Sequence, residues 1–275
     1  MRLTLRGGAS MKGTENRPHR WVTDEPDIPF ELDVLYEDAR IIVVDKPHFL
    51  ATTPRGMWYR QSALIRLRER FGEPDITPAH RLDRATAGVV VFVRDKASRG
   101  AYQMLFQERR ARKIYECLAP VVPASPAPGI AAARVSAFAA VDDSPALTAP
   151  VFPLTRASRI VKERGCLQAY EEPGEPNAVT EIERAAVLVP PDVPAGERGV
   201  ARYVLRPHTG KTHQLRVHMN ALGLPMLGDD LYPRIVERPY DDFSDPLRLV
   251  ARVLEFDDPF TGEPRRFVSR VALGV

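Results

Sequence analysis

The sequence predicts an α+β fold built on a mixed, mostly antiparallel central sheet with flanking helices and loops. Short segments of alternating or β-branched apolar residues recur along the 275 residues, whereas only three segments repeat apolar residues at helical spacing. The links between these segments are short and irregular. This order fits an antiparallel or mixed sheet better than a regular βαβ array, in which a helix follows each strand.

Eight segments are expected to be strands. Residues 30–36 alternate between apolar and polar, residues 41–44 are apolar, and the turn between them predicts a hairpin. Residues 89–93 are apolar and mostly β-branched, which predicts a buried strand. The full set of expected strands is 30–36, 41–44, 89–93, 113–118, 179–189, 200–205, 249–256 and 266–271.

Three helices are expected, and each has a recognisable start or end. Ser62, Asp95 and Thr212 are good N-cap residues, because their side-chain oxygens accept from free backbone N–H groups. Gly72 and Gly223 are typical C-terminal stops. The expected helices are 62–71, 96–107 and 212–222.

The composition is typical of a soluble globular protein, with 44% hydrophobic and 27% charged residues. No apolar run is long enough to span a bilayer, and the basic segment 1–20 lacks the apolar core of a secretory signal. We therefore expect a cytoplasmic protein without a membrane partner. Cys117 and Cys166 lie outside any metal-binding spacing, which favours a reducing compartment.

The chain is expected to form one large domain. Residues 1–28 are polar and basic without periodicity and predict a flexible extension. Residues 29–275 form the domain itself, with a Pro-rich loop insert near 119–150. The net charge of +3 does not by itself indicate a nucleic-acid partner, but the basic residues at 109–113 form a local cluster. Such a cluster suits a polyanion or the C-terminal cap of the preceding helix.

The polar segment from His80 to Gly88 is the first candidate site. It runs directly into the expected buried strand 89–93, so Asp83 lies on a loop at the edge of the sheet. A carboxylate that neighbouring cations keep ionised suits a nucleophile or a general base. The structural alternative is a turn in which Asp83 caps backbone N–H groups and Gly88 supplies a positive φ.

Other chemistries find little support. His208, His213 and His218 are five residues apart, whereas two ligands on one helix face need a spacing of four. The sequence contains no P-loop, no GxGxxG and no GxSxG. Neither a metal site nor a nucleotide cofactor is expected.

A second segment far along the chain changes the interpretation of Asp83. The pattern His80-Arg81-Leu82-Asp83-x-x-Thr86-x-Gly88, followed by Thr209-Gly210-Lys211-Thr212-His213-Gln214-Leu215-Arg216, resembles the RluA branch of the pseudouridine synthases. Supporting segments at 36–47, 113–115 and 222–232 occur in the family's order. The resemblance extends over roughly residues 30–275.

The resemblance implies the pseudouridine synthase fold and an isomerase that converts uridine in RNA to pseudouridine without a metal or cofactor. It makes Asp83 the catalytic carboxylate and Arg216 its ion-pair partner. Tyr115 matches a tyrosine that packs on the base, although ordinary packing in the core is the alternative. Arg81 matches an arginine that takes the place of the flipped base, and a solvated loop charge is its alternative.

Further residues follow from the same resemblance. Leu222 corresponds to an apolar floor of the base pocket. Ala87 departs from the family's usual serine, and Lys211 from its commoner arginine. The residues expected to bind RNA are Arg109, Arg110, Arg112, Lys113, Lys211 and His213.

The expected partner is a ribosomal or transfer RNA, bound by a monomer. Two alternatives stay open at the level of the sequence. A catalytically silent RNA-binding protein on the same fold would not need the full set of Asp83, Tyr115 and Arg216. A base-excising glycosylase would release free uracil.

Overall fold

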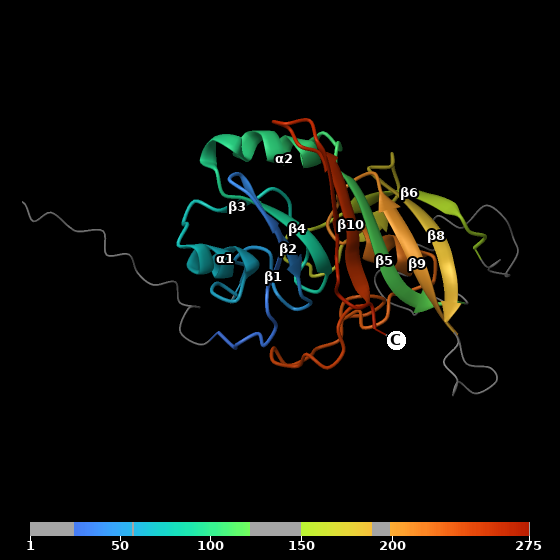
Figure 1. Ribbon diagram of the computed structural model, residues 1–275. Helices are drawn as coiled ribbons and strands as arrows, with labels where there is room; N and C mark the ends of the chain where they lie inside the picture. Colours follow the sequence, from blue (N-terminus) through green and yellow to red (C-terminus); the bar gives the residue numbers. More distant parts are fainter. Residues whose placement is uncertain (1–24, 57, 122–149, 189–198, 275) are drawn as a thin grey trace, which may run out of the picture.

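The structure is a computed structural model that describes residues 25–56, 58–121, 150–188 and 199–274. In these ranges the sheet has eleven strands (Figure 1). In chain order the first five strands are β1 (Asp33–Glu37), β2 (Ile41–Lys46), β3 (Thr77–Pro78), β4 (Ala87–Val93) and β5 (Arg112–Pro120). The others are β6 (Leu154–Val161), β7 (Tyr170–Glu172), β8 (Ala178–Leu188), β9 (Val200–Pro207), β10 (Leu249–Asp257) and β11 (Pro264–Val268). The helical elements are α1 (Ala63–Phe71), the 3-10 turn η1 (Lys96–Ser98), α2 (Arg99–Gln107) and α4 (Gln214–Ala221).

The sheet is mixed and mostly antiparallel, as predicted. Its main order is β1-β2-β4-β10-β5-β9-β8-β6-β7, with β3 paired to β4 and β11 paired to β10. Among the described strands, β4 and β10 form the one parallel pair, through Ala87 with Val250 and Gly88 with Ala251. This pair joins the half of the sheet that begins at β1 to the half that ends at β7.

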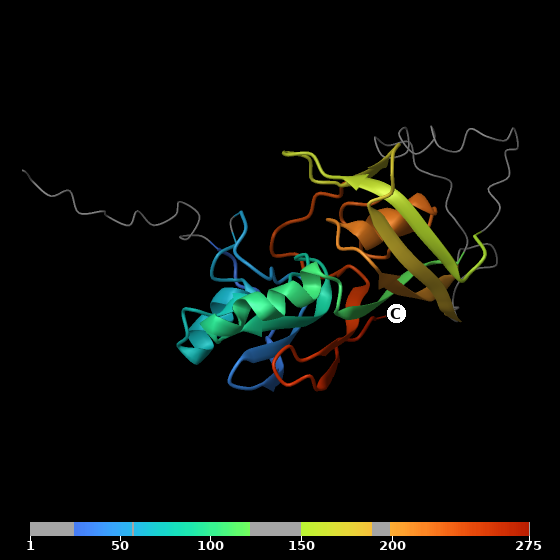
Figure 2. The same ribbon diagram turned by 90° about the horizontal axis from the view of Figure 1, so that it is seen from above.

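The β2–β4 half of the sheet is covered on both faces. Alternate residues of a strand point to opposite faces, and Val90 of β4 packs with α1 while Val91 packs with α2. All seven residues of β4 are buried for this reason. The other half of the sheet curves around α4 (Figure 2), whose Leu215 and Met219 pack on β5, β8 and β9.

The eight predicted strands and three predicted helices are present, with boundaries that differ by a few residues, but β3, β6 and β7 were not predicted, and one helix start was wrong. Gly72 and Gly223 have positive φ at the ends of α1 and α4, as expected of C-terminal stops. Asp95 accepts from the N–H of Ala97 at the start of η1. Thr212, however, is not the N-cap of α4: that position belongs to His213, with φ 56°. Gln214 Oε1 accepts from the N–H of Lys211 at this helix start.

The described residues cover only part of the predicted N-terminal extension and of the predicted Pro-rich insert. Residues 25–28 fell within the predicted extension, but they are docked on the domain. The carboxylate of Glu25 accepts from the N–H groups of Tyr59, Arg60 and Gln61, and Ile28 is buried. The rest of the extension and most of the Pro-rich insert lie outside the described residues. No helix in the described part of the chain is long and apolar enough to cross a membrane.

Candidate active site

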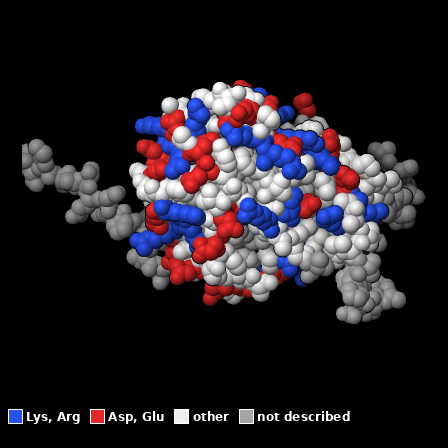
Figure 3. All heavy atoms as spheres, in the orientation of Figure 1, with Lys and Arg blue, Asp and Glu red and all other residues white. Residues whose placement is uncertain are grey.

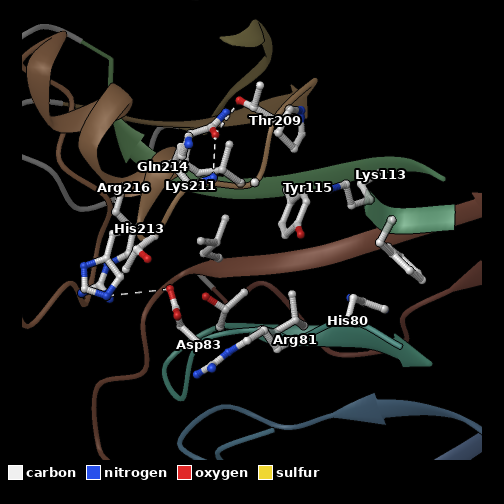
Figure 4. A pocket seen from close by; sticks show the side chains of 18 of the residues that line it. His80, Arg81, Asp83, Lys113, Tyr115, Thr209, Lys211, His213, Gln214 and Arg216 are labelled. Atoms are coloured by element: carbon white, nitrogen blue, oxygen red, sulfur yellow. Dashed lines mark hydrogen bonds and ion pairs between the residues drawn. The ribbon is translucent and has the colours of Figure 1, made fainter. Parts of the chain in front are cut away.

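A pocket of about 540 Å³ opens where the two halves of the sheet meet (Figure 4). Its volume lies within the range of small-molecule sites. Its wall is formed by the loop before β4, the end of α2, the start of β5, the segment between β9 and α4, the first turn of α4 and the first residue of β10, together with Arg55. Residues that matter below are Arg81, Asp83, Lys113, Tyr115, Lys211, His213, Leu215, Arg216 and Leu249.

The parallel contact between β4 and β10 depends on Gly88. Its φ is +118°, and a Cβ atom there would lie 2.3 Å from the carbonyl oxygen of Ala251. Only glycine combines this backbone conformation with such a close approach. The positive φ that the structural alternative gave to Gly88 is therefore present, and it lies in β4, directly after the loop that carries Asp83.

Three side chains from the end of β2 and the segment after it hold the Asp83 loop from behind. Thr52 Oγ1 donates to the carbonyl of Leu82 at 2.8 Å and accepts from its N–H at 3.1 Å. His48 Nδ1 donates to the carbonyl of Ala85 at 2.8 Å. Lys46 Nζ is fully buried, donates to the carbonyl of Leu50 at 2.7 Å, and lies 3.4 Å from the carbonyl of Arg84.

Burial affects the charge of two of these anchors. It lowers the pKa of Lys46 to about 7, although the Asp83 carboxylate opposes the shift. It lowers the pKa of His48 to about 4, so this ring is neutral at pH 7. The backbone of the Asp83 loop is thus held by hydrogen bonds from Thr52, His48 and Lys46.

Asp83 faces His213 rather than an arginine. Oδ2 of Asp83 lies 3.9 Å from Nε2 of His213, and the Asp83 side chain is 31% exposed in the pocket. The predicted ion pair between Asp83 and Arg216 is wrong. Nε of Arg216 donates to Asp229 at 2.9 Å, and Nη2 donates to Asp230 at 2.8 Å.

The reason for this pairing is burial. Arg216 is 3% exposed on α4, and its charge requires a buried counterion. Asp229 meets that need because its side chain is 1% exposed and also accepts from the N–H of Leu231. Side-chain hydrogen bonding and the charge of Asp229 raise the pKa of Arg216 despite desolvation, and Asp83 contributes at longer range. Arg216 therefore acts on Asp83 through the electrostatic field and not by contact.

Tyr115 projects into the pocket from β5, between the Asp83 loop and the segment before α4 (Figure 4). It also packs at the junction of two core clusters, so the predicted site role and the packing alternative describe the same side chain. Burial and the charge of Asp83 raise the pKa of its hydroxyl. A phenol held neutral in this way suits contact with a base more than proton abstraction at pH 7.

Of the two predicted site residues Arg81 and Leu222, only Arg81 lines the pocket. Arg81 is exposed and lines the pocket beside Asp83. Leu222 ends α4 and packs against the α4 core cluster without lining the pocket. The predicted apolar floor is therefore wrong for Leu222, and Leu215 and Leu249 provide that surface instead. Leu222 lies more than one helical turn beyond the residues of α4 that face the pocket.

A basic groove of about 750 Å³ continues from the pocket. The two share Phe106, Lys113 and Lys211 among their lining residues. The residues of this groove that bear on charge are Arg109, Arg110, Arg112, Lys113, Glu181, Arg206, His208 and Lys211. On the face of the molecule seen in Figure 3, basic and acidic side chains are interspersed. The basic character of the groove therefore rests on the side chains that line it, and not on an excess of positive charge over that whole face.

Two of the predicted RNA-binding arginines have intramolecular partners. Arg110 pairs with Glu108 at 2.8 Å and Arg112 with Glu255 at 3.4 Å, both largely exposed pairs that exchange readily with solvent. Arg109 has positive φ at the end of α2, and its charge adds to desolvation in lowering the pKa of Lys113. The structure thus brings Arg109, Lys113 and Lys211 to one groove.

Sequence reasoning missed several parts of the site. Asp229 and Tyr232 belong to a segment that supported the family resemblance, but their spacing gave no sign that they bind Arg216 and His213. The anchors Lys46, His48 and Thr52 form hydrogen bonds 30 to 38 residues away in sequence. Among the described residues, no group of three or more His, Cys, Asp or Glu side chains is arranged to hold a metal ion.

The fold and the pocket define the class of protein. Two solved structures share the fold. The first is Human RNA Pseudouridylate Synthase Domain Containing 1, with a TM-score of 0.59 and 22% sequence identity; the matched region covers 90% of this chain and 86% of that protein's chain. Human RNA Pseudouridylate Synthase Domain Containing 4 has a TM-score of 0.57 at 22% identity and covers 87% and 88%. The fold is that of the pseudouridylate synthases.

The sequence comparisons narrow the class to a family. Residues 40–221 match the RNA pseudouridylate synthase family. The Dual-specificity RNA pseudouridine synthase RluA of Haemophilus influenzae is 31% identical over 241 residues, which are 87% of this chain and 93% of that protein. Its namesake in Escherichia coli K12 is 34% identical over 237 residues, 86% and 91% of the two chains. The chain belongs to the RNA pseudouridylate synthase family, in its RluA branch, and is an isomerase of uridine in RNA.

Proposed function

We propose that this protein isomerises uridine in structured ribosomal or transfer RNA, with Asp83 as its catalytic carboxylate. The observation that carries the proposal is the position of Asp83, which follows Leu82, whose backbone bonds to Thr52, faces His213 and is partly exposed in the pocket. A carboxylate with this access can reach the junction of sugar and base. A silent RNA-binding protein would have no need for a carboxylate exposed in the pocket beside Tyr115.

The reaction is a rearrangement that needs no external atom. The N1–C1′ bond of the uridine breaks, the base turns, and C5 bonds to C1′ while the C5 proton is lost and N1 gains one. The Asp83 carboxylate acts at the sugar of the target nucleotide, and the neutral Tyr115 ring packs against its base. Because a stacked base cannot reach the pocket, the target nucleotide must leave its stack at a cost of a few kcal/mol. We propose that Arg81, exposed beside Asp83, fills the vacated position.

The basic groove is proposed to hold the RNA backbone that continues from the flipped nucleotide. Arg109, Lys113 and Lys211 carry positive charge along it, and phosphate contacts of this kind contribute most of the affinity for a polyanion. We also propose a cytoplasmic monomer, because one chain supplies the carboxylate, the tyrosine and the basic groove together. Light scattering of the purified protein gives its mass in solution.

Replacing Asp83 by asparagine tests the proposal. The Asp83→Asn variant keeps the size of the side chain but removes its charge, so pseudouridine formation should fall by at least about a thousandfold. Tritium release from C5-labelled uridine in transcribed RNA measures the reaction, and chromatography of the products detects free uracil. Asp257→Asn is the matched control, because Asp257 is exposed at the far end of β10.

The outcomes separate the alternatives. An active Asp83→Asn enzyme would overturn the role of Asp83. Release of uracil in place of pseudouridine would identify a glycosylase. Binding without either product in the unaltered protein would identify a silent RNA-binding protein.

A further inference from the structure

The side chains of Asp83 and His213 face each other in the pocket. The Oδ2 atom of Asp83 and the Nε2 atom of His213 are 3.9 Å apart, which is too far for a hydrogen bond between them (Figure 4). The His213 side chain is only 10% exposed, and its one open direction is the pocket. Which hydrogen-bonding role Nε2 plays depends on where the imidazole proton lies.

Tyr232 places that proton on the other ring nitrogen. The phenol oxygen of Tyr232 donates its single proton to the carbonyl of Ala169 at 2.8 Å and accepts from the N–H of Ala169 at 2.8 Å. Nδ1 of His213 lies 3.1 Å from the same oxygen. Because the phenol proton is already used, Nδ1 must donate, and Nε2 carries a lone pair.

The charges around His213 leave the ring neutral. Burial lowers the pKa of His213 below its ordinary value. The positive charges of Arg216 and Lys162 act in the same direction. The carboxylates of Asp83 and Asp229 oppose the shift without reversing it. At pH 7 the pocket therefore presents a neutral acceptor nitrogen beside the catalytic carboxylate.

The backbone also holds His213 in an uncommon conformation. Its φ is 56°, which non-glycine residues seldom adopt outside functional or turn positions. This conformation ends the segment after β9 and begins α4, and it points the ring at Asp83 and not along the helix. The ring is thus fixed at both ends, by the backbone and by Tyr232.

We propose that Nε2 of His213 accepts a hydrogen bond from the 2′-hydroxyl of the target ribose, which makes His213 the residue that selects ribose over deoxyribose at that nucleotide. The inference rests on the proposed function, because only then does Asp83 lie at the sugar. The 2′-oxygen is attached to C2′, next to C1′, where the glycosidic bond is broken. A hydroxyl has one proton to donate, so a bond to His213 leaves the Asp83 carboxylate free for the reacting atoms. The 2′-hydroxyl is the group that distinguishes RNA from DNA.

A double-mutant cycle tests this contact by combining a substitution of His213 in the protein with removal of the 2′-hydroxyl from the RNA. The probe is an RNA fragment that the unaltered protein converts, prepared with uridine or with 2′-fluoro-2′-deoxyuridine at the target position. The fluoro group has a similar size but cannot donate. In the unaltered protein we expect its affinity to fall about fivefold, as for one neutral hydrogen bond. In His213→Ala the two fragments should bind within about twofold of each other, because the acceptor is gone.

His208→Ala is the matched control. His208 is an exposed histidine of the basic groove that pairs with Glu181 at 2.7 Å and does not line the pocket around Asp83. Its fluoro penalty should remain about fivefold, even if overall affinity falls. His213→Asn is the second variant, since asparagine tolerates positive φ and its short side chain does not reach the 2′-oxygen.

The result that would overturn the inference is a fluoro penalty that stays the same in His213→Ala and His213→Asn as in the unaltered protein. In that case the substitution weakens the binding of both fragments equally, which indicates that His213 has a purely structural role. Failure of the proposed function looks different: the unaltered protein would then convert no uridine in any RNA, and no such fragment would be obtained.

Discussion

At the scale of single residues, the site is organised by which charges are buried. Arg216 is almost fully enclosed, and its counterions are Asp229 and Asp230 on the segment after α4. This leaves Asp83 without an arginine in contact, so its carboxylate stays accessible to a sugar. The pair also fixes Tyr232, because Asp229 accepts from the Tyr232 N–H at 2.9 Å. Arg216 thus supports the site by positioning the residue that orients His213.

Replacing Asp229 and Asp230 one at a time should separate the buried pair from the exposed one. Asp229→Asn leaves a buried guanidinium without its main counterion, so the free energy of unfolding should fall by about 3–5 kcal/mol. Asp230→Asn is the matched control: its side chain is 40% exposed, and the loss should stay below about 1 kcal/mol. Urea denaturation at pH 7 measures both. Equal losses would contradict the assignment of Asp229 as the principal partner.

At the scale of elements, the sequence predicted the local structure well where the pattern was local. Alternation placed β1, β5, β8, β9 and β10 within a few residues of their observed ends. The pairing of β4 with β10 could not be predicted, because the two strands lie far apart in the chain and neither carries a pattern that specifies its partner. Gly88 carried the one local sign of it, a glycine directly before the apolar run 89–93.

Substituting Gly88 should damage both stability and activity. In Gly88→Ala the new Cβ meets the Ala251 backbone at 2.3 Å and the positive φ is strained, so we expect a loss of more than about 2 kcal/mol in the free energy of unfolding. Gly100→Ala is the control, because Gly100 lies in α2 and a Cβ atom there would meet nothing within 4 Å. That change should stabilise by up to about 1 kcal/mol. Thermal unfolding of the two variants distinguishes them; similar midpoints would refute the close-approach argument.

At the scale of the whole molecule, the sequence motifs identified the family and the residue at its centre, but not the contacts between distant segments. Asp83 and Tyr115 lie in one pocket as expected. The family resemblance made Arg216 the ion-pair partner of Asp83, but burial decides which charges pair, and Arg216 pairs with Asp229 and Asp230. His213 was expected only to bind RNA. Its neighbours Asp83 and Tyr232 come from two other segments of the chain, and no periodicity links the three.

The course of the RNA across the molecule gives the last prediction. If the basic groove holds the backbone, each phosphate contact releases counterions, and the logarithm of the binding constant falls linearly with the logarithm of salt concentration. Removing one such contact in Lys211→Ala or Arg109→Ala should lower this slope by about 0.7 and weaken binding similarly for all RNA sequences. Lys96→Ala is the matched control, because Lys96 is exposed at the opposite end of α2 from the groove. Titrations of RNA at several salt concentrations measure the slopes. An unchanged slope in both groove variants would place the RNA backbone on another face, and the pocket would then have to recognise its uridine without help from the groove.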